Sequence, residues 1–369
     1  MPYSIGEIAR ALGGTALGQR DLVVTHAGEP GHAGADGLAV ALDASYAEAL
    51  AADTSRAALV WEGADWQALG LDAAITVDRG RAALVPLTRL LDPGPDEWDG
   101  LHPSAVIHPE AKLAADVTVG PFSVIGRGAR IGEGSRIGAQ CGIGAGVVLG
   151  AGARLFPGAH LLPRIHIGRG FIAHTGAVIG ADGFSFVTPD TLNLEEARKS
   201  LGKTNHLAET TAGDTTTWQR IHSLGTVEIG DNVEVGVNSS IDRGTLRATK
   251  IGHGTKVDNL VQIGHNVIVG DNCLICAMSG LAGSVRMGNR VVVGAKGGIS
   301  DNLVIGDDVV IAGGSGVLSN VPTGQMVMGY PATKMETNLN MYKALRRLPR
   351  LLGDFKALQN AVSKGTKDT

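Results

Sequence analysis

The densest group of polar side chains lies in one ten-residue segment, VDNLVQIGHN, at residues 257–266. It holds a single histidine, His265, together with Asp258, Asn259, Gln262 and Asn266. A histidine with an ordinary pKa of about 6.5 can accept a proton from an attacking nucleophile at neutral pH. Carboxylate and amide side chains beside it can hold a polar substrate by hydrogen bonds. The segment therefore predicts a polar site that contains His265.

An exposed turn is the plainer interpretation of the same residues. A lone histidine is usually a surface residue, and solvated turn polarity explains its polar neighbours as well. If residues six positions apart stack on one another, Asn259 and His265 lie close together on one face. That expected proximity favours the interpretation as a site.

The elements that carry these residues follow a six-residue period. An aliphatic residue recurs at every sixth position from residue 107 to 179, and again from 229 to 317, with a slip of four residues between Ile241 and Ile251. Glycine often follows it, which suits a short strand that ends in a turn. One such unit cannot bury its aliphatic side chain alone, but coils stacked at about 4.8 Å can. The period therefore predicts a mainly β protein, a parallel β-helix.

The period also divides the chain. Residues 1–98 lack it and are typical of a small α/β domain, whereas residues 99–325 form the predicted β-helix domain. A polar insertion at residues 183–224 and the slip at 243–250 interrupt the coil, and both are expected at functional edges. Residues 326–369 carry apolar residues at helical spacing and an excess of basic residues. They predict a C-terminal helical extension that either covers the open end of the coil or binds an acidic partner.

Composition excludes several classes of protein. The 54 glycines and 4% aromatic residues suit a repeat fold of tight turns. Three cysteines, Cys141, Cys273 and Cys276, do not make a disulfide framework, and the one CxxC pair is weak evidence for a metal, so we expect none. The net charge of −4 gives no general attraction to nucleic acid. Without a secretion signal or a long apolar stretch, we expect a cytoplasmic protein with no membrane span.

Four segments together carry a more specific resemblance: VDNLVQIGHN, IDRG at 241–244, GADGF at 180–184 and LAGS at 281–284. With the flanking domains, they make the chain similar to the UDP-3-O-(3-hydroxyacyl)glucosamine N-acyltransferases, hexapeptide-repeat acyltransferases of lipid A biosynthesis. The resemblance implies a left-handed β-helix, a homotrimer, and transfer of a 3-hydroxyacyl group from acyl carrier protein to the 2-amino group of a UDP-3-O-acylglucosamine. It implies no permanently bound cofactor, because the acyl donor is carried on the phosphopantetheine of acyl carrier protein.

The resemblance also implies roles for single residues. His265 matches the family's catalytic base, and Gly283 matches its backbone N–H donor to the oxyanion, a contact typically worth about 3 kcal/mol. Substrate-binding positions are matched by Asp43 and Tyr46 at the uracil, Asp258, Asn259, Gln262 and Asn266 at the sugar or phosphates, and Asn302 in the turn where enterobacterial members have a second histidine. Two further positions depart from the family pattern: Val40 replaces a phenylalanine that stacks on the uracil, and His222 replaces a loop proline.

Other functions stay open at this point. One is an O-acyltransferase acting on UDP-N-acetylglucosamine, or a coenzyme A-dependent sugar N-acetyltransferase. Another is a trimeric zinc carbonic anhydrase, which needs three histidines that converge across a subunit boundary, and His222, His253 and His265 are available. A third is a scaffold that binds a nucleotide sugar without catalysis.

Overall fold

The computed structural model describes residues 2–94, 98–188, 217–329 and 332–365. The chain divides into two compact units, residues 1–96 and residues 97–369. This division lies two residues before the predicted boundary at residue 98. None of the helices in the described ranges has the length and apolar character that crossing a bilayer requires.

The N-terminal unit is an α/β domain around one five-stranded sheet, in the order β2, β7, β6, β5, β4. Only β2 runs antiparallel to its neighbour. The first helix begins at Ile5 because Ser4 and Glu7 form a capping box, in which each side chain bonds the other's backbone N–H. The elements are β1 (Tyr3–Ser4), α1 (Ile5–Leu12), β2 (Thr15–Gly18), β3 (Val23–Val24), β4 (His26–Gly28), β5 (Gly37–Ala41), η1 (Ala44–Tyr46), α2 (Ala47–Ala51), β6 (Ala57–Val60), β7 (Ala73–Thr76) and α3 (Gly80–Leu91).

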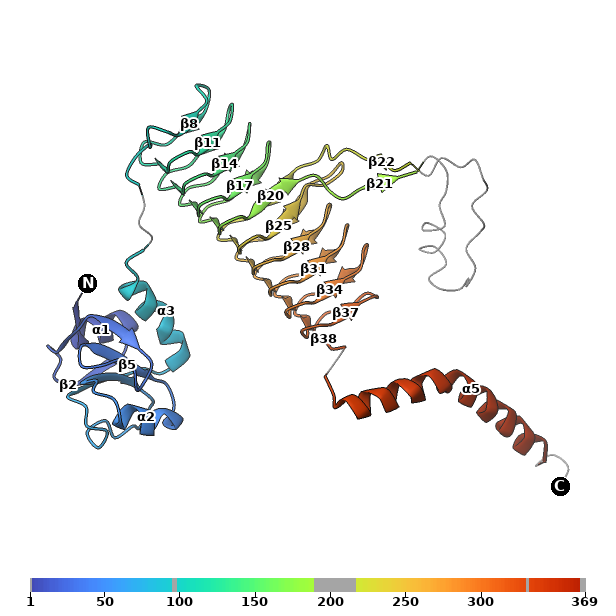
Figure 1. The fold of residues 1–369 in the computed structure, drawn as a ribbon, viewed down its shortest axis with the longest axis horizontal. Coiled ribbons are helices and arrows are strands. Elements are labelled where there is room, and N and C mark those ends of the chain that lie inside the picture. The colour runs from blue at the N-terminus through green and yellow to red at the C-terminus, as the bar shows by residue number, and fades with distance from the viewer. Residues whose placement is uncertain (1, 95–97, 189–216, 330–331, 366–369) are drawn as a thin grey trace. The chain divides into compact units, whose positions relative to one another are not determined.

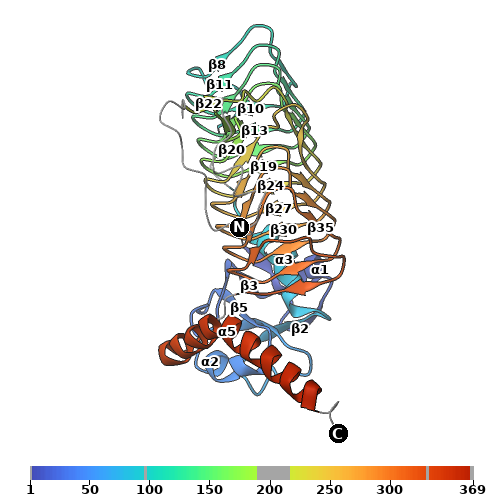
Figure 2. The ribbon, with the colours of Figure 1, turned by 90° about the vertical axis from the view of Figure 1, so that its right-hand side faces the viewer.

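The second unit is a parallel β-helix whose coils stack along one direction, as predicted (Figures 1 and 2). Its short strands form three faces. Face 1 consists of β8 (Val106–Ile107), β11 (Val124–Ile125), β14 (Gly142–Ile143), β17 (His160–Leu161), β20 (Val178–Ala181), β25 (Ser240–Asp242), β28 (Gln262–Ile263), β31 (Gly280–Leu281), β34 (Gly298–Ile299) and β37 (Gly316–Val317). Face 2 consists of β9 (Lys112–Leu113), β12 (Arg130–Ile131), β15 (Val148–Leu149), β18 (His166–Ile167), β23 (Val227–Ile229), β26 (Thr249–Ile251), β29 (Ile268–Val269), β32 (Arg286–Met287) and β35 (Val304–Ile305).

Face 3 closes each coil. It consists of β10 (Thr118–Val119), β13 (Arg136–Ile137), β16 (Arg154–Leu155), β19 (Ile172–Ala173), β24 (Glu234–Val235), β27 (Lys256–Val257), β30 (Leu274–Ile275), β33 (Val292–Val293), β36 (Val310–Ile311) and β38 (Met326–Val327). We call the turns between faces the 1–2 corner, the 2–3 corner and the 3–1 corner. The last strand, β38, extends the β-helix two residues beyond the predicted boundary at residue 325.

Residues that stack on one another are 18 positions apart, because three six-residue units make one coil. Ile263 of β28, for example, pairs with Leu281 of β31. The expectation that residues six apart stack is therefore wrong. Residues six apart lie on successive faces or corners of the same coil. Asn259 belongs to the 3–1 corner and His265 to the 1–2 corner, so the two are not neighbours in a stack.

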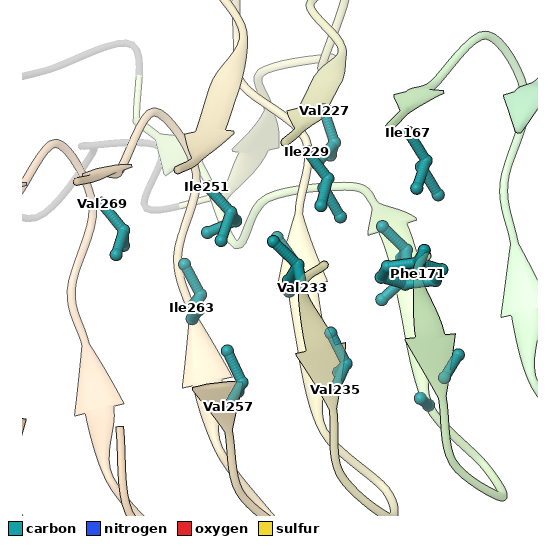
Figure 3. Packing of buried hydrophobic residues seen from close by; sticks show 14 of the residues in the cluster. Ile167, Phe171, Val227, Ile229, Val233, Val235, Ile251, Val257, Ile263 and Val269 are labelled. Carbon is teal, nitrogen blue, oxygen red and sulfur yellow. The ribbon is translucent and has the colours of Figure 1, made fainter. Parts of the chain in front are cut away.

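The interior of the β-helix is a continuous apolar column. The aliphatic residue of nearly every six-residue unit points inward and is almost fully buried, as Ile167, Ile229 and Ile251 show for face 2 (Figure 3). In the terminal coils, Ile107, Leu113 and Val327 are partly buried. Phe171 is the largest side chain in this column with no exposed surface. Coils joined in this way hold the turns of each corner at fixed spacing, which suits a site built from corner residues.

Both interruptions of the period leave the coil at the 1–2 corner. The first begins after β20 and returns at β23, and its two ends pair as the hairpin β21 (Phe186–Val187) and β22 (Gln219–Arg220). The middle of the predicted 183–224 insertion, residues 189–216, lies outside the described residues. The second interruption lies between β25 and β26. The two contact each other where the N–H groups of Leu224 and Gly225 both donate to the carbonyl of Thr245.

The C-terminal extension is one helix, α5 (Met335–Gly365), with Pro349 inside it. The sequence predicted one or two short helices, since proline removes a backbone donor. All described side chains of α5, through residue 360, are exposed. The helix therefore buries none of its apolar side chains in the single chain, and the expected covering of the open coil gains no support.

Candidate functional site

A cavity of about 670 Å³ lies at the 1–2 corner, where the hairpin of β21 and β22 leaves the coil. The β-helix contributes its polar side and the hairpin its aromatic side. Three residues predicted for the site are in its wall, namely His265, Gly283 and Asn302. Among the described residues, the lining consists of Phe184, Ser185, Phe186, Trp218, His265, Ala282, Gly283, Ser284, Asp301 and Asn302.

The imidazole of His265 lies between two glycines, Gly183 and Gly283. At either glycine, a side chain larger than hydrogen would collide with the histidine. A Cβ built on Gly283 would lie 2.8 Å from Cε1 and 2.9 Å from Nε2 of His265. A Cβ on Gly183 would lie 2.7 Å from the Cβ of the histidine. Gly283 stacks on His265 because it follows one coil, 18 residues, later. The backbones of Gly183 and Gly283 therefore pack against the ring on both sides.

Asn266 determines which nitrogen of His265 carries the proton. Its Oδ1 accepts the N–H of Thr245 at 3.1 Å, and its Nδ2 donates to the carbonyl of Arg247 at 3.3 Å. These two contacts fix the orientation of the amide. Nδ1 of His265 lies 3.0 Å from the same Oδ1, so Nδ1 must donate and must hold the proton. Nε2 of the neutral ring then has the free lone pair that a general base needs.

Gly283 also presents an open donor. Its carbonyl accepts the N–H of Asn302 at 3.1 Å, but within the described ranges its own N–H donates no hydrogen bond. Because Gly283 lines the cavity next to His265, this N–H and the lone pair of Nε2 are close together. A preorganised N–H of this kind stabilises a developing oxyanion.

A buried carboxyl lies on the other side of His265. Asp242, in the IDRG segment, has only 7% of its surface exposed, and Gln262 donates from Nε2 to its Oδ2 at 3.0 Å. Burial raises the pKa of Asp242, while the hydrogen bond from the amide of Gln262 acts in the opposite direction. Gln262, predicted to bind substrate, is thus engaged with Asp242.

Arg243 joins the coils on either side of the first insertion. Its guanidinium is buried, with Nε donating to the carbonyl of Gly180 at 2.7 Å and Nη2 donating to the carbonyl of Pro163 at 2.9 Å. Asp182 lies 4.0 Å from Nε. Burial lowers the pKa of Arg243. The arginine thus fixes the base of the insertion where Gly183 reaches His265.

Two predicted site residues lie elsewhere. Asn259 Oδ1 accepts the N–H of Val237 at 2.6 Å, and Asp258 Oδ2 accepts the N–H of Ala277 at 2.9 Å. Both therefore close turns at the 3–1 corner. The proximity of Asn259 to His265 inferred from six-residue spacing was wrong because a coil needs three such units.

The predicted uracil residues lie in the N-terminal unit. Asp43 caps the short helix η1 through hydrogen bonds with the backbone N–H and the hydroxyl of Ser45, and these bonds lower the pKa of Asp43. Tyr46 has 41% of its surface exposed, so its ring is accessible for stacking. Val40 is half-buried in β5.

The sequence analysis did not predict the aromatic wall of the cavity, nor that Asp301 lines it. Phe184, Phe186 and Trp218 come from the hairpin, and the guanidinium of Arg220 lies 4.6 Å above the ring of Phe186. Phe184 was visible in the GADGF segment. Trp218 follows an insertion without period, and Asp301 occupies an ordinary turn position, so neither gave a signal.

The three cysteines are free thiols, and burial raises the pKa of Cys141 and of Cys273. Among the residues that the structure describes, no group of three or more His, Cys, Asp or Glu side chains is arranged to hold a metal ion. His253 lies at the 2–3 corner, where its Nδ1 accepts the N–H of Asp231 at 2.9 Å. It is therefore not in the wall of the cavity that contains His265.

Comparison with known proteins supports the hexapeptide repeat and also finds relatives that match almost the whole chain. The family model for bacterial transferase hexapeptides (six repeats) matches residues 110–145 and 248–283. The solved structure of an Arabidopsis UDP-N-acetylglucosamine acyltransferase has a TM-score of 0.50 with 24% identity, covering 62% of this chain and 71% of that one, which shows a shared fold. The predicted β-helix fold is confirmed.

Two curated relatives match almost the full length. A UDP-3-O-acylglucosamine N-acyltransferase of Ruegeria pomeroyi is 61% identical over 99% of both chains. The protein of the same name from Paracoccus denitrificans is 60% identical over 99% of this chain and 98% of its own. This similarity includes the N-terminal unit, the β-helix and the C-terminal helix, and the chain therefore belongs to the UDP-3-O-acylglucosamine N-acyltransferase family.

Proposed function

We propose that this enzyme transfers a 3-hydroxyacyl group from acyl carrier protein to the 2-amino group of a UDP-3-O-acylglucosamine in lipid A biosynthesis. The observation that carries the proposal is the pairing, in one cavity, of the free lone pair on His265 Nε2 with the open N–H of Gly283. Acyl transfer to an amine needs a base and an oxyanion donor in the same site.

Each group has a defined step. His265 Nε2 takes a proton from the sugar amine as its nitrogen attacks the thioester carbonyl. The new C–N bond places negative charge on the carbonyl oxygen, and the Gly283 N–H stabilises it. When the C–S bond breaks, the imidazolium of His265 returns the proton to the departing thiolate. Asn266 accepts from Nδ1 throughout, which keeps the ring in one orientation.

The walls of the cavity suit two acylated substrates. Phe184, Phe186 and Trp218 supply an apolar side, and Asp301 with Asn302 supplies a polar one. Gln262 and Asn266 orient the groups around His265 through Asp242 and Thr245. Asp43 and Tyr46 would bind the uracil from the N-terminal unit, with Tyr46 stacking on the base.

A homotrimer is part of the proposal. Three large apolar side chains are exposed at the 3–1 corner, Phe122, Leu260 and Met278, and each adopts a left-handed conformation with φ of 59°, 59° and 60°. That conformation costs roughly 1 kcal/mol for each residue that is not glycine. Burial of these side chains between copies would offset the cost. In a trimer, Asp258 and Asn259 at this corner would serve a cavity shared with a neighbouring copy.

The exposed helix α5 suits the acyl carrier protein as an acidic partner. Its described basic residues are Lys343, Arg346, Arg347, Arg350 and Lys356, against Glu336 and Asp354. A basic helix of this kind favours association with an acidic surface. The donor then brings its own phosphopantetheine, so the enzyme would hold no permanent cofactor. The three free thiols support an enzyme of the cytoplasm.

The test is acyl transfer by the purified protein, with 3-hydroxyacyl groups of several lengths on acyl carrier protein and UDP-3-O-acylglucosamine as acceptor. We expect transfer by the wild type and loss of at least about 100-fold in kcat with His265→Ala, with the oligomer unchanged by light scattering. UDP-N-acetylglucosamine as acceptor and coenzyme A thioesters as donors are run in parallel. Faster transfer with either one would replace the proposed function by that of the corresponding acyltransferase.

A further inference from the structure

At the 2–3 corner, backbone N–H groups of the turns donate hydrogen bonds to side chains of the next coil. We call an N–H that makes such a bond closed. The side chain that occupies one fixed turn position accepts the N–H of the residue stacked on it in the preceding coil. Five such bonds follow one another: Arg169 N–H to Asp231 (2.7 Å), Asp231 N–H to His253 (2.9 Å), His253 N–H to Asp271 (2.7 Å), Asp271 N–H to Asn289 (2.8 Å) and Asn289 N–H to Asp307 (2.6 Å). An aspartate at this position therefore closes the N–H one coil before it.

The 1–2 corner has the same turn geometry at the cavity. Asn302 has a φ of 61°, and the residue after Asp307, Asp308, has a φ of 57°. Asp301 thus occupies the turn position of Asp307, and Gly283 is the residue 18 positions before it. By the rule of the other corner, the carboxylate of Asp301 would accept the N–H of Gly283.

That bond is not made. Oδ2 of Asp301 instead accepts Nδ2 of Asn302 at 3.0 Å. The Gly283 N–H donates to nothing within the described residues. Asp301, Asn302 and Gly283 all line the cavity. At the 1–2 corner the carboxylate of Asp301 thus accepts the side chain of Asn302, whereas at the 2–3 corner Asp307 accepts both the backbone N–H and Nδ2 of Asn289.

We propose that Asn302 is a positioning residue that keeps the carboxylate of Asp301 away from the N–H of Gly283. Without the amide of Asn302, the carboxylate would close the N–H as Asp307 closes that of Asn289. A closed N–H cannot stabilise the oxyanion, and a carboxylate beside it would repel the developing negative charge. This proposal rests on the proposed function, in which the Gly283 N–H is the oxyanion donor.

The test compares Asn302→Gly with the double variant Asp301→Ala/Asn302→Gly. Glycine removes the amide and tolerates the left-handed turn, so backbone strain does not enter. Loss of a complete oxyanion donor costs about 10²- to 10³-fold in kcat, and we expect Asn302→Gly to lose about tenfold or more in kcat with a smaller change in KM. The double variant has no carboxylate to close the N–H, so most of the lost kcat returns.

Each result decides the matter. Unchanged kcat in Asn302→Gly overturns the proposal. Equal losses in the single and double variants also overturn it, because Asn302 then acts on substrate directly. Asp307→Ala, which removes the matching carboxylate at the 2–3 corner, is the control and should keep the wild-type kcat. A crystal structure of Asn302→Gly gives a readout independent of activity: we expect an oxygen of Asp301 about 3 Å from the Gly283 nitrogen. This readout stands even if wild-type protein transfers no acyl group, so failure of the proposed function is distinguishable.

Discussion

Oδ1 of Asn266 lies 3.0 Å from Nδ1 of His265 and accepts the N–H of Thr245 at the same time. The second interruption of the coil, residues 243–248, thus orients the amide of Asn266, and this amide in turn orients the ring of His265. A segment that breaks the sequence period is in this way part of the proposed catalytic geometry.

Asn266→Gly should lower kcat by about 100-fold or more, because the imidazole loses the acceptor that selects its tautomer. Asn266→Asp keeps an oxygen for both Nδ1 of His265 and the N–H of Thr245. It should therefore retain much more activity than the glycine variant. Steady-state kinetics of both variants, with thermal melts as a control for folding, check this prediction. Equal losses in both would show that the role of Asn266 is structural.

Gly283→Ala should lower kcat by about 100-fold without unfolding the β-helix. The new methyl group would lie within 3 Å of the His265 ring, and misplacement of a catalytic group by about 1 Å can cost that much. Gly313→Ala, at the 3–1 corner, is the matched control, since its nearest neighbour is the carbonyl of Ala295 at 3.2 Å. A variant of Gly283 with normal kcat would exclude the proposed geometry.

Asp242→Asn should raise the melting temperature at pH 7. Because burial raises the pKa of Asp242, the native state holds this proton more tightly than the unfolded state. The contribution of Asp242 to stability therefore falls as pH rises from the unfolded pKa of about 3.9 through the raised native pKa. Asparagine keeps an acceptor for Gln262 without the charge. Melts from pH 4 to pH 8 should show a gap that grows with pH, and a constant gap would contradict the explanation.

Phe171→Ala should lower the free energy of unfolding by about 3–5 kcal/mol. Phe171 is fully buried in the interior column (Figure 3). The residue 18 positions earlier, at the stacked position of the preceding coil, is only Ala153. Urea unfolding at fixed protein concentration measures the change. Val304→Ala, at an exposed position of face 2, is the control and should cost less than about 1 kcal/mol.

The six-residue period was sufficient to predict the β-helix, because nearly all of the aliphatic positions, such as Ile263, are buried. It could not give the number of units in a coil, since faces repeat identically in sequence. For that reason Asn259 was expected beside His265, whereas Gly283 is its actual neighbour. The hydrogen bonds of Asp242 and Asp301 depend on contacts between coils, and a turn residue in the sequence carries no mark of them.

The break between β20 and β23 has a consequence for folding kinetics. Most strand pairs in the β-helix join residues 18 apart, so the loop between them is short and closes quickly. Ile167, however, pairs with Ile229 across 62 residues. Closing a longer loop costs more entropy and slows the step. We expect the segments before and after the insertion to nucleate separately, as units of a one-dimensional array do. Phe184 lies at the start of the insertion and His265 follows it, so the wall of the cavity would be complete only when the two segments join.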